Sequence, residues 1–375
     1  MARTVGIGIQ NFEKIIANQY FYIDKTHFIK EWWENGDDVT LITRPRRFGK
    51  TLNINMLERF FSLVYKGQGL IFEHLSIWQE EKYRNLQGTY PVIAFSFADI
   101  KEPSLSGAKK RFCQIIEELY NQYYFLPDSG CLNEKEKEQF LRVSVDINDY
   151  ESVNSIKMLS GFLSRYYQKN VIILLDEYDT LLEEAYVSGY WNKLAGFIRS
   201  FFHAAFKSNK YLERALMTGI TRISKESIFS DLNNLEVVTA TSEKYEDSFG
   251  FTEQEVFEAL QECGLYEKRQ NVKDWYDGFT FGKKQDIYNP WSILNYLDKK
   301  RFSAYWANTS SNSLAGKLIR EGSPAVKQTK EDLLKGNQIR TELDEQIIFD
   351  QLDQDEHAVW SLLLASGYLK VEEHT

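Results

Sequence analysis

The residues best suited to chemistry lie in two short segments, and the first could bind phosphate. The run RPRRFGKT occupies residues 44–51 and ends in Gly49, Lys50 and Thr51. Successive backbone N–H groups and the positive end of a following helix can hold phosphate oxygens, and a glycine lets the backbone come close. Lys50 would add a point charge at the β- and γ-phosphates, and the Thr51 hydroxyl can ligate Mg²⁺. The segment predicts a nucleotide-binding loop with contacts from Arg46, Arg47, Phe48, Gly49, Lys50, Thr51 and Leu52.

The match to the phosphate-loop pattern G-x-x-x-x-G-K-[ST] is incomplete, because Arg44 stands at the first glycine position. Glycine makes the entry turn easy through its freedom at positive φ. Without it we expect the loop to enter differently, with Arg44, Arg46 and Arg47 adding positive charge near the phosphates. The alternative is a basic loop at the end of a strand, since short motifs also arise by chance.

The second segment supplies carboxylates. The run VIILLDEYD covers residues 171–179, and its five leading apolar residues suit a strand buried on both faces of a parallel sheet. Asp176 and Glu177 follow where that strand would emerge at the carboxyl edge, which is where open α/β sheets bind ligands. In this Walker B interpretation Asp176 holds Mg²⁺ and Glu177 acts as general base toward the attacking water. The alternative is a strand before a helix with an acidic first turn, but the loop upstream makes nucleotide binding the stronger interpretation.

Strands and helices must alternate to bring these segments together. An apolar run at 39–43 leads into the loop, and apolar residues follow it at helical spacing from position 52 to position 61. Further buried strands are expected at 91–97, 171–175, 214–220 and 235–240. We therefore predict an α/β fold with a mostly parallel five-stranded sheet and helices on both faces. A strand at 19–23 and a helix at 26–33 should precede it, and the polar stretch 128–152 should be a mobile insertion.

Two further residues could respond to the γ-phosphate. Thr218 and Arg222 lie at the tip of the strand expected at 214–220, where nucleotide-driven switches place polar or cationic groups. Thr218 is therefore a candidate nucleotide contact and Arg222 a candidate catalytic residue. The alternative, held level with this one, is that Thr218 caps a turn and Arg222 makes a surface ion pair.

The chain divides into three predicted regions. Residues 1–248 would form the nucleotide-binding core, 249–300 a helical lid opened by a capping box at 252–255, and 301–375 a mostly helical region. Within the lid, Asn289 and Pro290 start a helix whose dipole could face nucleotide, whereas the lid's tryptophans are expected to pack the small domain. The strand-like run 367–371 has no obvious partner, which suggests a truncated chain or a missing downstream domain.

Composition narrows the class of protein. The chain has 375 residues, of which 43% are hydrophobic, and 54 acidic against 45 basic residues give a net charge of −9. We expect a globular protein of two or three domains that is not built as a whole to bind a polyanion, although the loop at 44–50 is a local basic patch. Three cysteines without a CxxC pair and scattered histidines argue against disulfides or a zinc site. Neither a signal-peptide pattern nor a membrane-spanning run is evident, so we predict a cytoplasmic protein.

Several motifs in order carry a family resemblance. They are YFYIDKT, RPRRFGKT, LLDEYD, TGITRIS, LNNLEVVT, FGFTEQEV, WYDGFTFG and YNPWSIL. Over residues 5–300 the sequence resembles the prokaryotic AAA-ATPase-like family, which is often encoded in many copies in anaerobic bacteria. The resemblance implies an additional-strand P-loop NTPase fold (ASCE class), in which a sensor strand separates the Walker B strand from the P-loop strand and a helical lid follows. The family pattern also has an arginine where Arg44 stands.

Two functions fit these residues. In the first, the protein is a bacterial ATPase that uses ATP and Mg²⁺ and couples hydrolysis to a conformational change. In the second, it is a nucleotide-dependent switch or scaffold with little turnover, acting on a protein partner or a downstream nuclease module. Many members of the resembled family carry a C-terminal PD-(D/E)xK nuclease-like domain, which this chain has no room for, so nuclease activity is not expected. A nucleic-acid motor is disfavoured by the net charge, although a homo-oligomer could assemble a basic channel. A small-molecule kinase is also disfavoured, because it would need a second arginine-rich lid loop and none is evident apart from the loop at 44–50.

Overall fold

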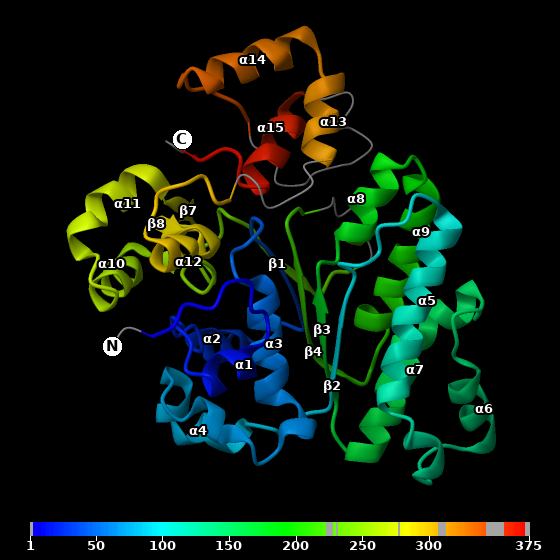
Figure 1. The fold of residues 1–375 in the computed structure, drawn as a ribbon. Coiled ribbons are helices and arrows are strands. Elements are labelled where there is room, and N and C mark those ends of the chain that lie inside the picture. Colours follow the sequence, from blue (N-terminus) through cyan, green and yellow to red (C-terminus); the bar gives the residue numbers. More distant parts are fainter. Residues whose placement is uncertain are drawn as a thin grey trace.

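The fold, drawn in Figure 1, is that of a computed structural model that describes residues 3–222, 228–229, 232–276, 278–306, 313–342 and 356–371. Its core is a parallel sheet with strand order β2-β3-β4-β1-β5. The strands are β1 (Val39–Thr43), β2 (Val92–Ser96), β3 (Val171–Asp176), β4 (Leu212–Gly219) and β5 (Leu235–Val238). β4 lies between β3 and β1, with Ala215 opposite both Ile173 and Val39. This confirms the predicted five-stranded sheet and the additional-strand arrangement.

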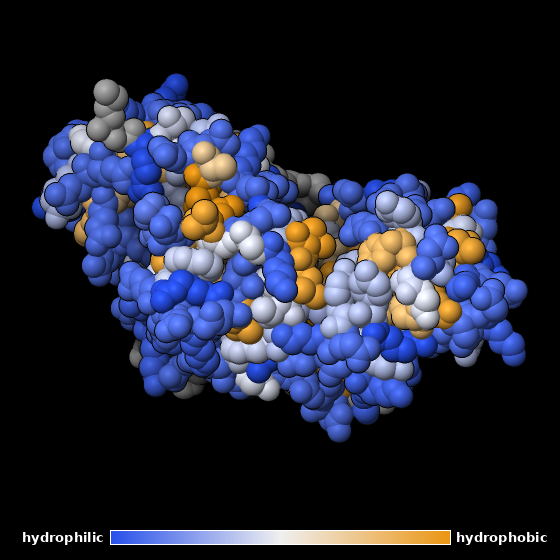
Figure 2. All heavy atoms as spheres, turned by 90° about the horizontal axis from the view of Figure 1, so that it is seen from below, coloured by the Kyte–Doolittle hydropathy of each residue, from blue (hydrophilic) through white to orange (hydrophobic). Residues whose placement is uncertain are grey.

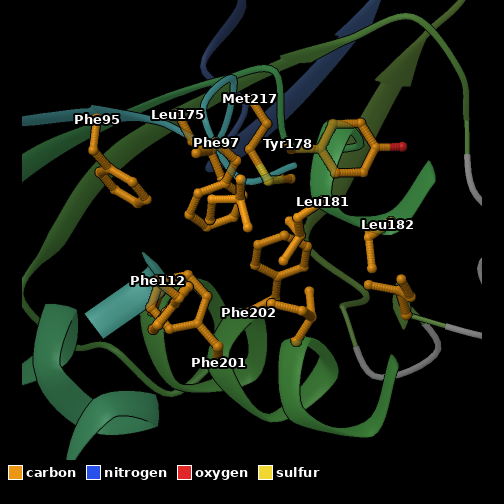
Figure 3. Packing of buried hydrophobic residues seen from close by; sticks show 14 of the residues in the cluster. Phe95, Phe97, Phe112, Leu175, Tyr178, Leu181, Leu182, Phe201, Phe202 and Met217 are labelled. Atoms are coloured by element: carbon orange, nitrogen blue, oxygen red, sulfur yellow. The ribbon is translucent and has the colours of Figure 1, made fainter. Parts of the chain in front are cut away.

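Helices cover both faces of this sheet (Figure 1). On one side lie α1 (Phe12–Ala17), α2 (His27–Asn35), α3 (Lys50–Phe61) and α4 (Glu81–Leu86), and on the other α5 (Leu105–Gln122), α6 (Glu134–Arg142), α7 (Asp149–Tyr167), α8 (Thr180–Val187) and α9 (Trp191–Phe202). Successive residues of β3 face opposite sides: Ile172 and Leu174 join the cluster with α3, and Ile173 joins the cluster with α5, α7 and α9. Figure 3 shows part of that second cluster, where the rings of Phe112 and Phe201 meet edge to face.

Two local expectations need correction. The strand predicted at 19–23 is wrong, because this segment forms no strand. Phe21 is instead buried in a cluster with residues of the 251–297 region, and Phe21 N donates to Thr4 O. The polar stretch at 128–152 contains α6, which opens with a capping box between Asn133 and Glu136. Phe140 on α6 is buried in the cluster with α5, α7 and α9, so this stretch packs against the core and is not a mobile insertion.

A second, smaller sheet lies in the region expected to be a helical lid. Its strands are β6 (Phe251–Thr252), β7 (Phe279–Phe281) and β8 (Lys284–Tyr288), which pair antiparallel in the order β6-β8-β7. The accompanying helices are α10 (Glu253–Glu262), α11 (Arg269–Tyr276) and α12 (Pro290–Lys299). The region is therefore not purely helical as expected, because these strands are too short to show an apolar run. The capping box of Thr252 and Glu255 is present as predicted.

The remaining helices lie at the top of Figure 1, beyond the carboxyl ends of the parallel strands. They are α13 (Ser313–Glu321), α14 (Pro324–Leu334) and α15 (Glu356–Ala365). The run at 367–371 is not a strand, and Tyr368 there packs against the ring of Trp306. None of the helices in the described chain has the length and apolarity needed to span a bilayer. Hydrophilic residues dominate the face in Figure 2, where hydrophobic residues form separate patches.

Candidate functional site

The loop at residues 44–50 leaves β1 at the carboxyl edge of the sheet and ends where α3 begins. Gly49 precedes the helix with φ of 86°, and Arg47 also has a positive φ, 71°. A side chain at position 49 would meet no atom within 4 Å, so the glycine is required by its backbone angle and not by crowding. Such angles are rare outside glycine and are kept where surrounding contacts enforce them, as at binding loops.

Lys50 lies inside the loop that it terminates. Its Nζ donates to Arg44 O at 2.8 Å and to Pro45 O at 2.9 Å, and the side chain is buried. Burial lowers the pKa of Lys50, while the nearby carboxylate of Asp176 acts in the opposite direction. The ammonium is thus held at the centre of the loop, where a phosphate bound by the α3 N-terminus would meet it.

Asp176 connects the end of β3 to α3 and to β4 through hydrogen bonds. Thr51 Oγ1 donates to Asp176 Oδ2 at 2.6 Å, and Thr218 Oγ1 on β4 donates to Asp176 Oδ1. Two predicted metal ligands and the predicted sensor residue therefore meet in one hydrogen-bonded group. Hydroxyl and carboxylate oxygens are the ligand types that Mg²⁺ takes in proteins, so Thr51 and Asp176 could hold that ion. The alternative that Thr218 only caps a turn does not describe its contact.

Glu177 follows directly and has a left-handed backbone, with φ of 51°. Its Oε2 accepts a hydrogen bond of 3.1 Å from Thr180 Oγ1. Burial raises the pKa of Glu177, and the negative charge of Asp176 adds to the shift. The geometry thus holds a carboxylate of increased proton affinity beside the Thr51–Asp176 pair.

Asp179 is a residue that the sequence analysis did not single out. One of its carboxylate oxygens, Oδ2, accepts hydrogen bonds from Ile220 N at 2.8 Å, Thr221 N at 2.8 Å and Thr221 Oγ1 at 3.0 Å. This fixes the turn after β4, and the half-buried Arg222 follows at once. The second aspartate of the run DEYD was the available sign of this role.

The side chains of four predicted nucleotide contacts are engaged with protein. Arg46 Nη2 lies 3.5 Å from Glu183 Oε2 on α8, and the Arg47 guanidinium lies 4.3 Å from the ring centroid of Trp291. Phe48 is buried against Phe279 and Phe281 of the small sheet, and Leu52 packs in the cluster around α3. The backbone N–H groups of these residues are what they can offer to phosphate.

Arg44 does not add positive charge at the phosphates as expected. Its side chain is 1% exposed and points into the contact between the core and the small sheet, where Nη1 donates to Thr239 O at 2.6 Å. The expectation failed because the sequence could not show that a pocket of carbonyls and aromatic rings lies behind the loop.

Residues from the start of α12 and from the segment after α12 donate hydrogen bonds to the backbone of the loop. Asn289 Nδ2 donates to Arg46 O at 3.2 Å, and Trp306 Nε1 donates to the same oxygen at 3.1 Å. Asn289 also caps α12 by accepting from Ser292 N, with Pro290 as the first helical residue. The predicted helix start therefore reaches the loop backbone through Asn289. Pro290 has no N–H to give.

The largely buried carboxyl group of Glu183 also belongs to this neighbourhood. Burial and the charge of Asp179 raise the pKa of Glu183 to about 8, although Arg46 opposes the shift. Glu183, Arg46 and Trp306 line a pocket together with residues of α13 and α15 and with Tyr368. The C-terminal helices thus border the same edge of the sheet as the loop.

Another cluster of titratable groups lies between α2 and the segment that follows β5. His27 Nε2 is 3.4 Å from Asp247 Oδ1, and Ser248 Oγ contacts both His27 Nε2 and Glu31 Oε2. The scattered histidines gave no sign of this cluster. Its members are paired with each other, and Ser248 O accepts from Asn53 Nδ2 on α3, which links the cluster to the helix that follows the loop.

The strand order, the loop between β1 and α3, and an aspartate at the end of β3 define a P-loop NTPase of the additional-strand class. The chain belongs to the AAA-ATPase-like family, described as predicted AAA-ATPases, whose model matches residues 6–229. Membership implies nucleotide binding. The chain is also similar to an uncharacterized protein in the vnfD 5′ region of Azotobacter chroococcum mcd 1, with 26% identity over 333 residues. That match covers 86% of this chain and 58% of the relative, so the chain spans less than two thirds of the relative's length.

Proposed function

We propose that this protein binds ATP with Mg²⁺ at the 44–51 segment and hydrolyses it. The observation that carries the proposal is the hydrogen-bonded group of Thr51, Asp176 and Thr218, with Glu177 next to it. Three predicted roles, those of metal ligand, γ-phosphate contact and general base, converge there from three separate segments. In the Walker nomenclature the loop would be the A motif and the end of β3 the B motif.

Each residue has a specific task in this proposal. Lys50 would exchange the carbonyls of Arg44 and Pro45 for phosphate oxygens. Thr51 and Asp176 would hold Mg²⁺, which when bound would neutralise charge on the phosphates. Glu177 accepts a proton from the water that attacks the γ-phosphorus, and its raised pKa brings its basicity closer to neutral pH. Arg222 stands beside the anchored turn after β4 and would stabilise the transferring phosphoryl group.

The test is steady-state phosphate release by wild type and Glu177→Gln, with bound nucleotide quantified in the same samples. We expect turnover to fall at least about 100-fold, with nucleotide binding retained. Glu184→Gln is the matched control, because Glu184 lies on α8, the helix that follows Glu177, and accepts from Ser188 Oγ, outside the group around Asp176. Normal hydrolysis by the Glu177→Gln protein would remove Glu177 as the base.

A nucleotide-dependent switch acting on a protein partner or on a second copy of the chain is the other candidate. It is favoured by the contacts of Asn289 and Trp306 with the loop, which tie elements outside the core to the nucleotide site. Limited proteolysis of residues 250–300 should then differ between ATP, ADP and no nucleotide. Equal cleavage in all three conditions, with nucleotide bound, would count against a switch.

A further inference from the structure

Arg44 occupies the position that a phosphate loop normally gives to glycine, yet it is among the most deeply buried side chains of the described chain. Nη1 donates to Thr43 O at 2.9 Å and to Thr239 O at 2.6 Å, and Nη2 donates to Tyr245 O at 3.4 Å. The last two carbonyls belong to the segment that connects β5 to the small sheet. A planar guanidinium can satisfy several acceptors at fixed angles, which an ammonium cannot do.

Aromatic rings complete the environment of this cation. The Arg44 guanidinium carbon lies 4.6 Å from the ring centroid of Phe281 on β7 and 5.8 Å from that of Phe249. Both distances suit attraction between a cation and the face of a ring, which is stronger where water is excluded. Phe281 also packs against Phe48 of the loop, so loop and small sheet share one apolar contact.

The backbone of Arg44 is equally engaged. Arg44 N donates to Gly219 O at the end of β4, and Arg44 O accepts from Lys50 Nζ. One residue therefore connects the end of β4, the lysine of the loop and the small sheet. A glycine here would keep only the backbone contacts, and the carbonyls of Thr239 and Tyr245 would each lose a charged donor.

We infer that Arg44 is a positioning residue for nucleotide, which makes the small antiparallel sheet part of the binding site. The inference rests on the proposed function and concerns how that same site is built. The loop is shaped by the anchored guanidinium in place of the conformational freedom of glycine. The anchor points Thr239, Tyr245, Phe249 and Phe281 all lie beyond residue 229, where the family match ends, so the functional nucleotide site extends through β7.

The experiment places at position 44 the glycine of the general phosphate-loop pattern. Affinity for Mg·ATPγS is measured by calorimetry for wild type, Arg44→Lys and Arg44→Gly, together with the thermal unfolding midpoint of each. We expect Arg44→Gly to weaken nucleotide binding at least about tenfold, since charged hydrogen bonds to buried carbonyls are lost, and Arg44→Lys to fall between. A loop that simply prefers glycine would bind as well as or better than wild type.

The matched control is Arg214→Lys and Arg214→Ala. Arg214 on β4 also donates to a backbone carbonyl, Trp32 O, and lies over an aromatic ring, Trp33, but toward the amino end of the sheet. These variants should lower the unfolding midpoint and leave nucleotide affinity unchanged. An equal loss of affinity in the Arg214 and Arg44 variants would reduce Arg44 to a general contributor to stability and overturn the inference.

Phe281→Leu tests the same anchor without changing any residue of the loop, in case Arg44→Gly does not fold. It removes the ring face under the guanidinium, and we expect nucleotide affinity to fall by about threefold or more, since such contacts are modest. Unchanged affinity in a folded Phe281→Leu protein would also overturn the inference. Wild-type protein that binds no nucleotide at all would overturn the proposed function itself, whereas unaffected Arg44 variants would overturn only the role of Arg44.

Discussion

The five-stranded sheet and the three-stranded sheet both contact the loop at residues 44–50, but they differ in pattern and in what they contribute. Every residue of β1 and β3 is buried, as expected for parallel strands covered on both faces. In β8 only the last two residues are buried. The large sheet brings the polar side chains of Asp176 and Thr218 to the loop, whereas the small domain supplies apolar packing and a hydrogen bond to the loop backbone. Chemistry and loop shape thus come from different parts of the chain.

Lys50→Ala should reduce phosphate release more than any other variant described below. A smaller reduction would contradict the assignment of the chemistry to the large sheet. The variant removes the cation at the centre of the loop, and we expect phosphate release to fall at least about 100-fold. Because burial already disfavours the charged lysine, the protein should stay folded, which circular dichroism can check. Lys66→Ala, at an exposed lysine, is the control. Substantial turnover without Lys50 would mean that the large sheet does not carry the chemistry.

Asn289 sharpens the comparison, because two variants separate its two hydrogen bonds. Asn289→Ala loses both the helix cap and the donor to Arg46 O, and we expect it to cost about 1–2 kcal/mol of stability and to weaken nucleotide binding several-fold. Asn289→Asp keeps the capping oxygen and loses the donor. Its unfolding free energy in urea should stay near wild type while affinity falls as in Asn289→Ala. Wild-type affinity in both proteins would show that the loop does not depend on this contact.

Glu183 gives the smallest effect, and it appears in the pH dependence of stability. Its pKa is raised to about 8 in the folded protein, so the folded state binds the proton more tightly than the unfolded state between the normal pKa near 4.5 and pH 8. The contribution of this group is full below the unfolded pKa and is lost as pH rises through the folded one. Glu183→Gln should therefore gain about 1 kcal/mol relative to wild type between pH 6.5 and 7.5, measured by urea unfolding. A constant difference between the two proteins across that range would contradict the assignment.

Much of the large sheet was predictable because its strands are apolar runs that do not depend on distant context. Val39–Thr43 and Val171–Asp176 fall where the sequence placed them, and the family resemblance implied the additional strand. The small sheet was missed because β6 has two residues and β7 three, too few for any periodicity to be visible. Its packing against the loop, through Phe48 with Phe279 and Phe281, joins residues far apart in the sequence, which no local pattern could show.

The candidate site likewise has a part that the sequence predicted and a part that it could not predict. Lys50, Thr51, Asp176, Glu177 and Thr218 are together, because each sits at a strand end or helix start whose position the sheet determines. The directions of Arg44, Arg46 and Arg47 could not be predicted, since a basic side chain on a loop can turn toward phosphate, a carboxylate or an aromatic ring. The structure turns them toward Thr239 O, Glu183 and Trp291, respectively.

The two hydrogen bonds that end on Arg46 O come from residues 243 and 260 positions further along the chain. At the usual pace of translation, roughly 10 to 50 seconds separate the emergence of the loop from the synthesis of these donors. Closing such long intervals of chain is also slow in folding, because the entropy of ordering them is lost before the contacts form. The nascent chain therefore carries an unfinished nucleotide loop on the ribosome, and the loop reaches its final shape only after residue 306 has been made.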